Sequence, residues 1–236
     1  MHYRVPPISG LYARNVFTSD TAIVLTPPVP GVALYYTTDG SLPTHASTPH
    51  TVPVHVSGDV ELRVRPFYPS GLAGPAQTIR LARQSLRPAD RVTGLLPGLR
   101  AEYYPIGVTT VQKLTGTPAS VVVAPDFVVP PGPRAPAFGM IFSGYLRVPE
   151  EGVYTFTVSS DDGSMLYVGE RLVVDNDGPH SRRGVSGQVA LSAGLQPVRL
   201  LFFEGGGGHS LQVEWEGPSW PRALLPGGAL FHEAGP

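Results

Sequence analysis

Glycine and proline punctuate this chain so densely that long helices have little room to form. The 236 residues include 28 glycines and 27 prolines, about twice the ordinary share, and both residue types destabilise helix interiors. Between them lie short segments of alternating apolar and polar residues, as in Val60–Arg65, Tyr154–Val158 and Leu211–Glu216. This alternation gives a strand one apolar and one solvated face. Since no stretch keeps a helical period over three turns, the chain is predicted to be all-β.

Composition excludes several classes of protein. A hydrophobic fraction of 42% suffices for a packed core, while 17 basic against 18 acidic residues argue against a nucleic-acid partner. No apolar run approaches the roughly 18 residues of a membrane span. The absence of cysteine excludes disulfide scaffolds, zinc–thiolate sites and cysteine nucleophiles. Residues 1–10 lack the apolar core of a signal peptide, so we expect a cytoplasmic protein or an export signal outside this chain.

The polar segment 83–90, which contains Pro88, separates two blocks rich in strand patterns. We therefore predict a first domain at residues 1–86, a linker at 87–97 and a second domain at 98–236, each domain large enough for a core. Five strands are expected in the first domain: Thr21–Thr26, Ala33–Thr37, Thr51–Val56, Val60–Tyr68 and Gln77–Ala82.

The first domain contains the segment Leu34–Thr44, which reads LYYTTDGSLPT, followed by possible closing strands near Leu62–Pro66 and Ser70–Leu72. This pattern resembles the chitobiase/β-hexosaminidase C-terminal domain, which implies an immunoglobulin-like sandwich serving as an accessory module. From the residues alone, Asp39 and its following glycine suit a tight turn. The alternative, a catalytic pair of Ser41 and His45, lacks an orienting acid.

The second domain carries an ordered series of short motifs. They are Gly98–Tyr104, Phe142–Leu146, Pro149–Phe156, Ser160–Val168, Leu172–Asn176, Leu191–Gly194, Glu204–Gly208 and Leu211–Trp215. The series resembles the protective-antigen fourteen-kilodalton domain, a β-barrel-like sandwich found in bacterial toxins, glycosidases and adhesins. The resemblance implies an all-β chain in which this sandwich follows the immunoglobulin-like one.

The adjacent carboxylates Asp161 and Asp162 are the main candidates for chemistry. In an extended chain neighbouring side chains point in opposite directions, but the two can converge on one ion if the peptide between them is cis. The resemblance implies that such a pair binds calcium, with further ligands from the loop Glu204–Ser210. The loop contains no Asn or Asp, so we expect the backbone of Gly205, Gly206 and Gly207 to supply them. The alternative is a plain turn in which the aspartates cap loop amides.

The resemblance also implies that the calcium holds a sugar, and the remaining candidates are residues expected to contact that glycan. They are Asn176, Asp177, His180, Arg182, Gly208 and His209. The alternative for Asn176 and Asp177 is a simple turn. The alternative for His180 and His209 is that they are only solvated, as exposed loop histidines commonly are.

The two resemblances together imply a non-catalytic carbohydrate-binding or adhesion module that depends on calcium. The expected partner is a glycan or cell-surface polysaccharide, and the expected location is extracellular or at the cell surface. The alternative is a structural spacer or assembly subunit contacting other domains. An enzyme is not predicted, because no nucleophile–base–acid set is visible and the two carboxylates are sequence neighbours, unlike the facing pair of a glycosidase.

Overall fold

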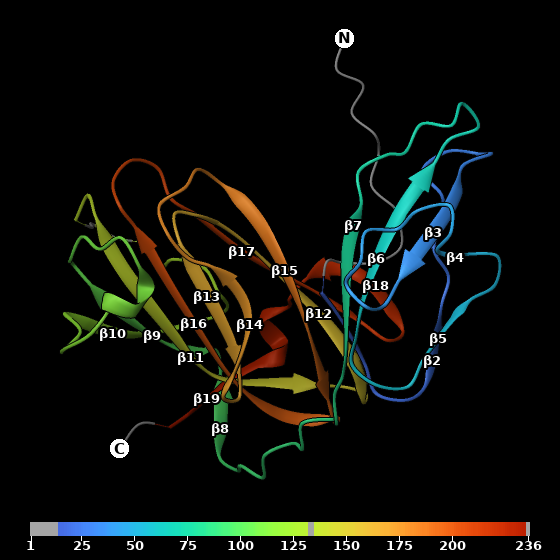
Figure 1. Cartoon of the computed structure of the whole chain (residues 1–236). Coiled ribbons are helices and arrows are strands. Elements are labelled where there is room, and N and C mark those ends of the chain that lie inside the picture. Colours follow the sequence, from blue (N-terminus) through green and yellow to red (C-terminus); the bar gives the residue numbers. More distant parts are fainter. Residues whose placement is uncertain (1–13, 132–134, 235–236) are drawn as a thin grey trace. The chain divides into compact units, whose positions relative to one another are not determined.

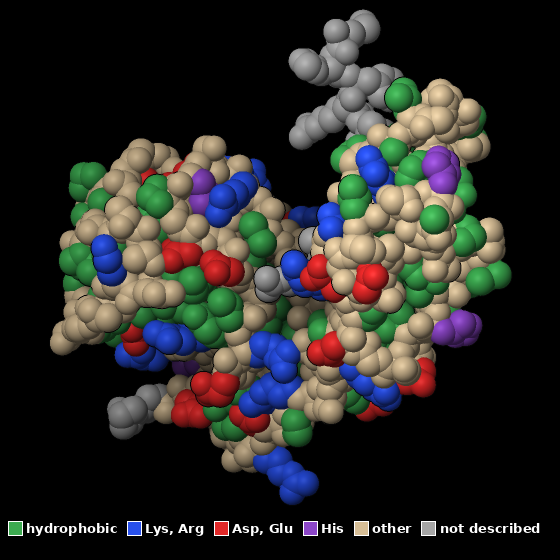
Figure 2. Space-filling view, in the orientation of Figure 1, with side chains coloured by type: hydrophobic (Ala, Val, Ile, Leu, Met, Phe, Trp, Pro, Cys, Tyr) green, Lys and Arg blue, Asp and Glu red, His purple; other side chains and the backbone are tan. Residues whose placement is uncertain are grey.

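The computed structural model describes residues 14–131 and 135–234, so the expectation about a signal peptide in residues 1–10 lies outside the described residues. The chain divides into two compact units, residues 1–85 and 86–236 (Figure 1). Strands dominate both units, which confirms the all-β prediction. Within the described ranges no helix is long and apolar enough to cross a bilayer. Figure 2 shows basic and acidic side chains interspersed on the visible face, in keeping with a formal net charge of -1.

The first unit contains a five-stranded sheet in the order β1-β7-β6-β3-β4 and a two-stranded sheet formed by β2 and β5. Its strands are β1 (Arg14–Phe17), β2 (Thr21–Ile23), β3 (Ala33–Thr37), β4 (Thr48–Pro49), β5 (Val54–Val56), β6 (Val60–Phe67) and β7 (Gln77–Arg83). Alternate residues of β6 and β7, such as Leu62, Val64, Ile79 and Leu81, are buried in its core. All five expected strands are present, and β1 and β4 are additional.

The turn after β3 is held by its own side chains. Asp39 accepts hydrogen bonds from the backbone N–H of Ser41 at 2.9 Å and from the Ser41 hydroxyl at 2.6 Å. The hydroxyl bond and the backbone bond together lower the pKa of Asp39. His45 packs its ring against Phe67, with 4.2 Å between centroids. Ser41 and His45 thus have separate structural partners, and the turn reading of this segment is confirmed.

The second unit packs an eight-stranded sheet against a four-stranded one. The larger sheet follows the order β10-β9-β11-β16-β13-β14, with β19 paired to β11 and β8 paired to β19, and the smaller one follows β15-β12-β17-β18. The strands are β8 (Leu95–Pro97), β9 (Leu99–Tyr104), β10 (Ser120–Ala124), β11 (Phe138–Val148), β12 (Gly152–Asp161), β13 (Ser164–Val168), β14 (Arg171–Asn176), β15 (Arg183–Leu191), β16 (Gly194–Glu204), β17 (Ser210–Gly217), β18 (Trp220–Leu224) and β19 (Leu230–Glu233). Two short 3-10 helices, η1 (Val111–Lys113) and η2 (Gly227–Ala229), complete it.

Strand β16 is buried on both faces, which explains its continuous apolar run. Leu200 and Phe202 belong to the core between the two sheets. Leu201 and Phe203 point the other way, into a second apolar cluster that includes Val111 of η1. A central strand covered on both sides loses the usual polar alternation. The end of β16 is therefore firmly held, and this strand end positions the site described below.

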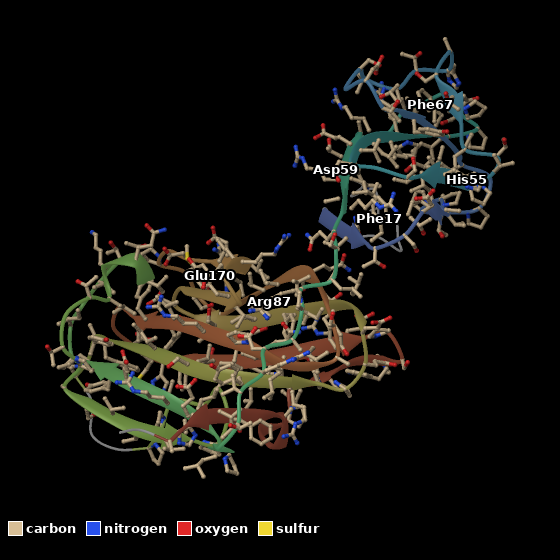
Figure 3. All side chains as sticks on the ribbon, turned by 90° about the horizontal axis from the view of Figure 1, so that it is seen from below. Phe17, His55, Asp59, Phe67, Arg87 and Glu170 are labelled. Atoms are coloured by element: carbon tan, nitrogen blue, oxygen red, sulfur yellow. The ribbon has the colours of Figure 1, made fainter. Side chains whose placement is uncertain are left out.

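Residues 87–97, expected to form a linker, belong to the second unit. The backbone N–H of Arg87 donates to Ala190 at 2.9 Å, and that of Asp90 donates to Leu195 at 2.8 Å. Figure 3 labels Arg87, whose guanidinium donates to Asp90 at 2.9 Å. Further along, β8 pairs with β19. Arg87 and Asp90 thus bind each other through their side chains, and their backbone N–H groups bind the backbone of the unit.

Candidate metal centre

Three carboxylates converge where β12 turns into β13. Strand β12 ends at Asp161, the peptide bond between Asp161 and Asp162 is cis, and Glu204 ends the neighbouring strand β16. The turn is attached to β16 because Phe203 donates its N–H to Gly163 at 3.0 Å. One oxygen from each of the three acidic side chains lies within 4.8 Å of the others. The pair foreseen from the sequence is therefore a triad.

Two loops fix these carboxylates through backbone amides. Asp162 accepts from the N–H of His180 and from the N–H of Gly205, each at 2.8 Å. Glu204 accepts from the N–H of Gly206 at 2.7 Å. The glycine loop thus holds the acids with its N–H groups. The predicted use of the carbonyl oxygens of Gly205, Gly206 and Gly207 as metal ligands remains a proposal. Gly207 has a φ of +120°, which favours glycine.

Glu204 is the most confined of the three acids. Only 1% of its surface is exposed, and its second oxygen, Oε2, is buried without a hydrogen-bond partner. Burial raises the pKa of the Glu204 carboxyl, and the negative charges of Asp162 and Asp161 raise it further, against the hydrogen bond from Gly206. None of the ion pairs among the described residues involves these three acids.

The cluster has the composition of a site for a hard cation. Close like charges repel, and a buried oxygen without a partner costs free energy. The hydroxyl of Ser210, which lies opposite Asp161 in the β12–β17 pair, is a second buried oxygen without a partner. A cation among these oxygens removes the repulsion and gives Glu204 Oε2 a partner. Asp161, Asp162 and Glu204 could therefore hold a metal ion, and oxygen donors of this kind suit calcium or magnesium.

Two residues expected to contact a ligand have structural partners instead. Asn176 is fully buried, donates to the Ser160 hydroxyl at 2.9 Å and accepts from Arg183 at 2.7 Å. The carboxylate of Asp177 accepts from the hydroxyl of Thr110 and from the backbone N–H that follows it. Their side chains hold the loop between β14 and β15, and it is the N–H of His180 in this loop that donates to Asp162. We therefore leave both out of the ligand surface.

The other expected contacts lie around the acids. His180 is half-buried, and its ring nitrogens lie 2.9 Å and 3.0 Å from two backbone carbonyl oxygens of its own loop. Arg182 is exposed and donates to Gln212 at 3.0 Å. Gly208 and His209 are exposed, and the His209 ring meets Phe138 edge-on with centroids 5.5 Å apart. We call His180, Arg182, Gly208 and His209 the rim of the site.

Glu204 begins the loop that was expected to supply ligands, but its side chain was not predicted to be one, although a signal was present. It is the single carboxylate at the end of the apolar run Leu200–Phe203. By alternation it shares a face with Leu200 and Phe202, whose side chains point into the core. A charged residue on the core face at the open end of a sandwich is typical of a site rather than of a solvated surface.

Comparison with known protein families agrees with this architecture. Residues 122–222 match the PA14 domain. Residues 12–78 match the chitobiase/beta-hexosaminidase C-terminal domain. The chain carries a PA14 domain preceded by a chitobiase/β-hexosaminidase C-terminal domain, as the motifs predicted.

Three individual proteins illustrate the similarity. A beta-hexosaminidase of Porphyromonas gingivalis is 25% identical over 198 residues, which are 79% of this chain and 25% of that protein, so the chain spans about a quarter of its length. The PA14 domain of the MpAFP antifreeze protein superposes with a TM-score of 0.52 at 19% identity, covering 61% of this chain and 95% of that domain. A PA14 sugar-binding domain from an RTX adhesin gives a TM-score of 0.51 at 16% identity, covering 58% and 99%. These superpositions establish the PA14 fold.

Proposed function

We propose that the chain is a non-catalytic, extracellular carbohydrate-binding module, in which Asp161, Asp162 and Glu204 hold a calcium ion that contacts the sugar. The observation that carries this proposal is the convergence of three carboxylates within 4.8 Å, one of them with a buried, unpartnered oxygen. A turn that served only to cap loop amides requires Asp162, but it gives no role to Glu204 Oε2.

Calcium suits this site better than magnesium. Calcium accepts six to eight oxygens in irregular geometry, whereas magnesium demands a near-ideal octahedron and keeps several waters. The donors here come from a tight turn and a strand end, which are fixed by Gly205, Gly206 and His180 rather than arranged around an octahedron. Three carboxylates more than balance the charge of the ion but leave coordination positions for other oxygens.

The open side of the ion would face the rim, where a sugar diol can replace water. Residues 205–209 are exposed, and four of them are glycines without side chains to block an approach. The solved sugar-binding domain from an RTX adhesin shares this fold. Exchange of two waters for two hydroxyls changes coordination energy little, so we expect millimolar affinity, about -4 kcal/mol. Specificity would come from His180, Arg182, Gly208 and His209.

The geometry favours binding over catalysis. Glycosidase carboxylates face each other across the scissile bond, whereas Asp161, Asp162 and Glu204 converge on a single point. Because this chain spans a quarter of a beta-hexosaminidase, we infer that such modules accompany catalytic or surface domains. The competing function is a spacer without a ligand, which the experiment below separates from sugar binding.

The test combines NMR titration with one matched pair of variants. Amide spectra are recorded during titration with a panel of simple sugars, in millimolar calcium and in chelator. We expect shifts at residues 205–209 in calcium alone, abolished by Asp162→Asn and retained by Glu170→Gln, an exposed carboxylate on the β13–β14 turn (Figure 3). Sugar shifts that persist in chelator refute the calcium mechanism, and calcium binding without any sugar response supports the spacer.

A further inference from the structure

The outer edge of the larger sheet in the second unit is an uncharged, apolar strand. Among the described strands, β10 (Ser120–Ala124) pairs with β9 alone, so it ends the sheet (Figure 1). Its sequence is SVVVA, and no charged residue occurs anywhere in residues 114–125. An edge strand presents unpaired backbone N–H and C=O groups, and an apolar one invites another strand.

The other edges of this unit are protected in the ways that natural proteins use. Each carries a charged residue or a proline within the strand, features that oppose pairing with a further strand. They are β8 with Pro97, β14 with Arg171 and Asp175, β15 with Arg183, and β18 with Pro221 and Arg222. Among the described strands of the unit, β10 is therefore the edge that lacks such protection.

Both faces of β10 expose apolar surface. Val121 and Val123 lie opposite the ion-paired Glu102 and Arg100, on the solvent face, and are 46% and 57% exposed. Val122 lies opposite the fully buried Ala101, on the core face, and yet is 45% exposed. The sandwich is thus open at this edge on the side where a neighbouring sheet would normally cover it.

We propose that β10 pairs antiparallel with β10 of a second copy of this chain, about a two-fold axis at Val122. In that register Val121 lies opposite the partner's Val123, and Val122 lies opposite its own copy. The strand is self-complementary because it is apolar and uncharged, so pairing brings no like charges together. A different partner strand that carried charged residues would have to bury them against Val121, Val122 and Val123.

The flanking prolines limit this contact to a small one. Pro118 and Pro125 bracket the strand, so the ladder cannot extend beyond it. A contact between five-residue strands falls well below the roughly 1,000 Å² of a stable interface. We therefore expect a weak dimer, with a Kd on the order of 0.1–1 mM, that closes upon itself instead of growing into a fibre.

Cysteine cross-linking of the full chain tests the register, because the natural chain contains no cysteine. Directly opposite residues have Cβ atoms about 4.5–5.5 Å apart, and diagonal ones about 7–8 Å. We expect Val122→Cys to form a self-disulfide readily. We also expect a mixture of Val121→Cys and Val123→Cys to cross-link faster than either variant alone. Leu224→Cys, an exposed apolar position on the protected edge β18, gives the rate of random collision.

Sedimentation of cysteine-free protein supplies an independent readout. Wild type should show a mass that rises with concentration toward about 1 mM, and Val122→Lys should remain monomeric with an unchanged melting temperature, since Val122 is half-exposed. A wild-type chain that stays monomeric at this concentration overturns the proposal. Val122→Cys oxidation no faster than that of Leu224→Cys overturns it too, and dimers that survive Val122→Lys assign the contact to another surface.

Discussion

Glutamate 204 provides the sharpest test of the metal centre, because neutralising it should raise the stability in chelator and reduce the stabilisation that calcium adds. Glu204→Gln keeps the size of the side chain and an oxygen that accepts from Gly206, but it removes the buried charge. At 4.8 Å and an effective dielectric constant of about 20, each pair of unit charges repels by roughly 3.5 kcal/mol. Since Asp161 and Asp162 are half-exposed and solvated, we expect Glu204→Gln to raise the free energy of unfolding without calcium by only about 2 kcal/mol.

In chelator this gain should raise the melting temperature by roughly 4–8 °C for a unit of this size. In calcium at a hundredfold excess over the wild-type Kd, wild type gains about 2.7 kcal/mol. The variant has lost one ligand, and with a Kd ten- to a hundredfold weaker it gains only about 0.4–1.4 kcal/mol. The calcium-dependent increase in melting temperature should therefore shrink by about half or more.

Tryptophan fluorescence is the appropriate assay. The chain has two tryptophans, Trp215 and Trp220, and both pack on Tyr154 in the second unit, so their emission follows this unit alone. Glu170→Gln should behave as wild type in both conditions. A lower melting temperature for Glu204→Gln in chelator would show that its carboxylate acts as an ordinary structural acceptor. An undiminished calcium response would remove it from the ligand set.

Three further predictions use the same assay. Burial raises the pKa of Tyr154 to about 12; since the unfolded chain releases this proton near pH 10, stability should fall by about 2–3 kcal/mol between pH 10 and 12, and Tyr154→Phe should flatten that fall. Gly187→Ala places a Cβ 1.7 Å from a backbone oxygen of β14 and should destabilise by more than about 3 kcal/mol, whereas Gly228→Ala, with open space around it, should change stability by under about 0.5 kcal/mol. A fragment of residues 86–236 should melt like the second unit of the full chain, and one of residues 98–236 should melt at a lower temperature; equal melting would mean that the connecting segment adds no stability.

The parts of the site that lie in one continuous segment could be predicted from the sequence. The turn at Asp161 and Asp162 is such a segment, and so is the glycine loop. Glu204 joins the aspartates only through the pairing of β16 with β13 and the attachment of that strand to the turn. Its role depends on which face of a strand it occupies at the end of the sandwich, and this is a property of the folded sheet rather than of a motif.

Burial explains the remaining differences. Asn176 resembles a surface turn residue in sequence, but it lies within the hydrogen-bond network of Ser160 and Arg183. Likewise the sequence places Arg87 and Asp90 in a solvated linker, whereas the structure gives them partners elsewhere in the second unit. Most polar residues lie at the surface, so a sequence alone predicts a solvent-exposed position for each of these three. Those with a long-range partner can be recognised only once the chain is folded.

The pairing of β8 with β19 has a mechanical consequence. Leu95 and Glu233 lie opposite each other, so the chain enters and leaves this strand pair at the same end. A force that pulled these two ends apart would load the hydrogen bonds one rung at a time, as in opening a zipper, because they run across the strands. A force arriving from the first unit, however, meets the Arg87 hydrogen bonds to β15 before it reaches β8. The hydrogen bonds of Arg87 to Ala190 and of Asp90 to Leu195 are thus loaded before the β8–β19 pair, which would otherwise open easily.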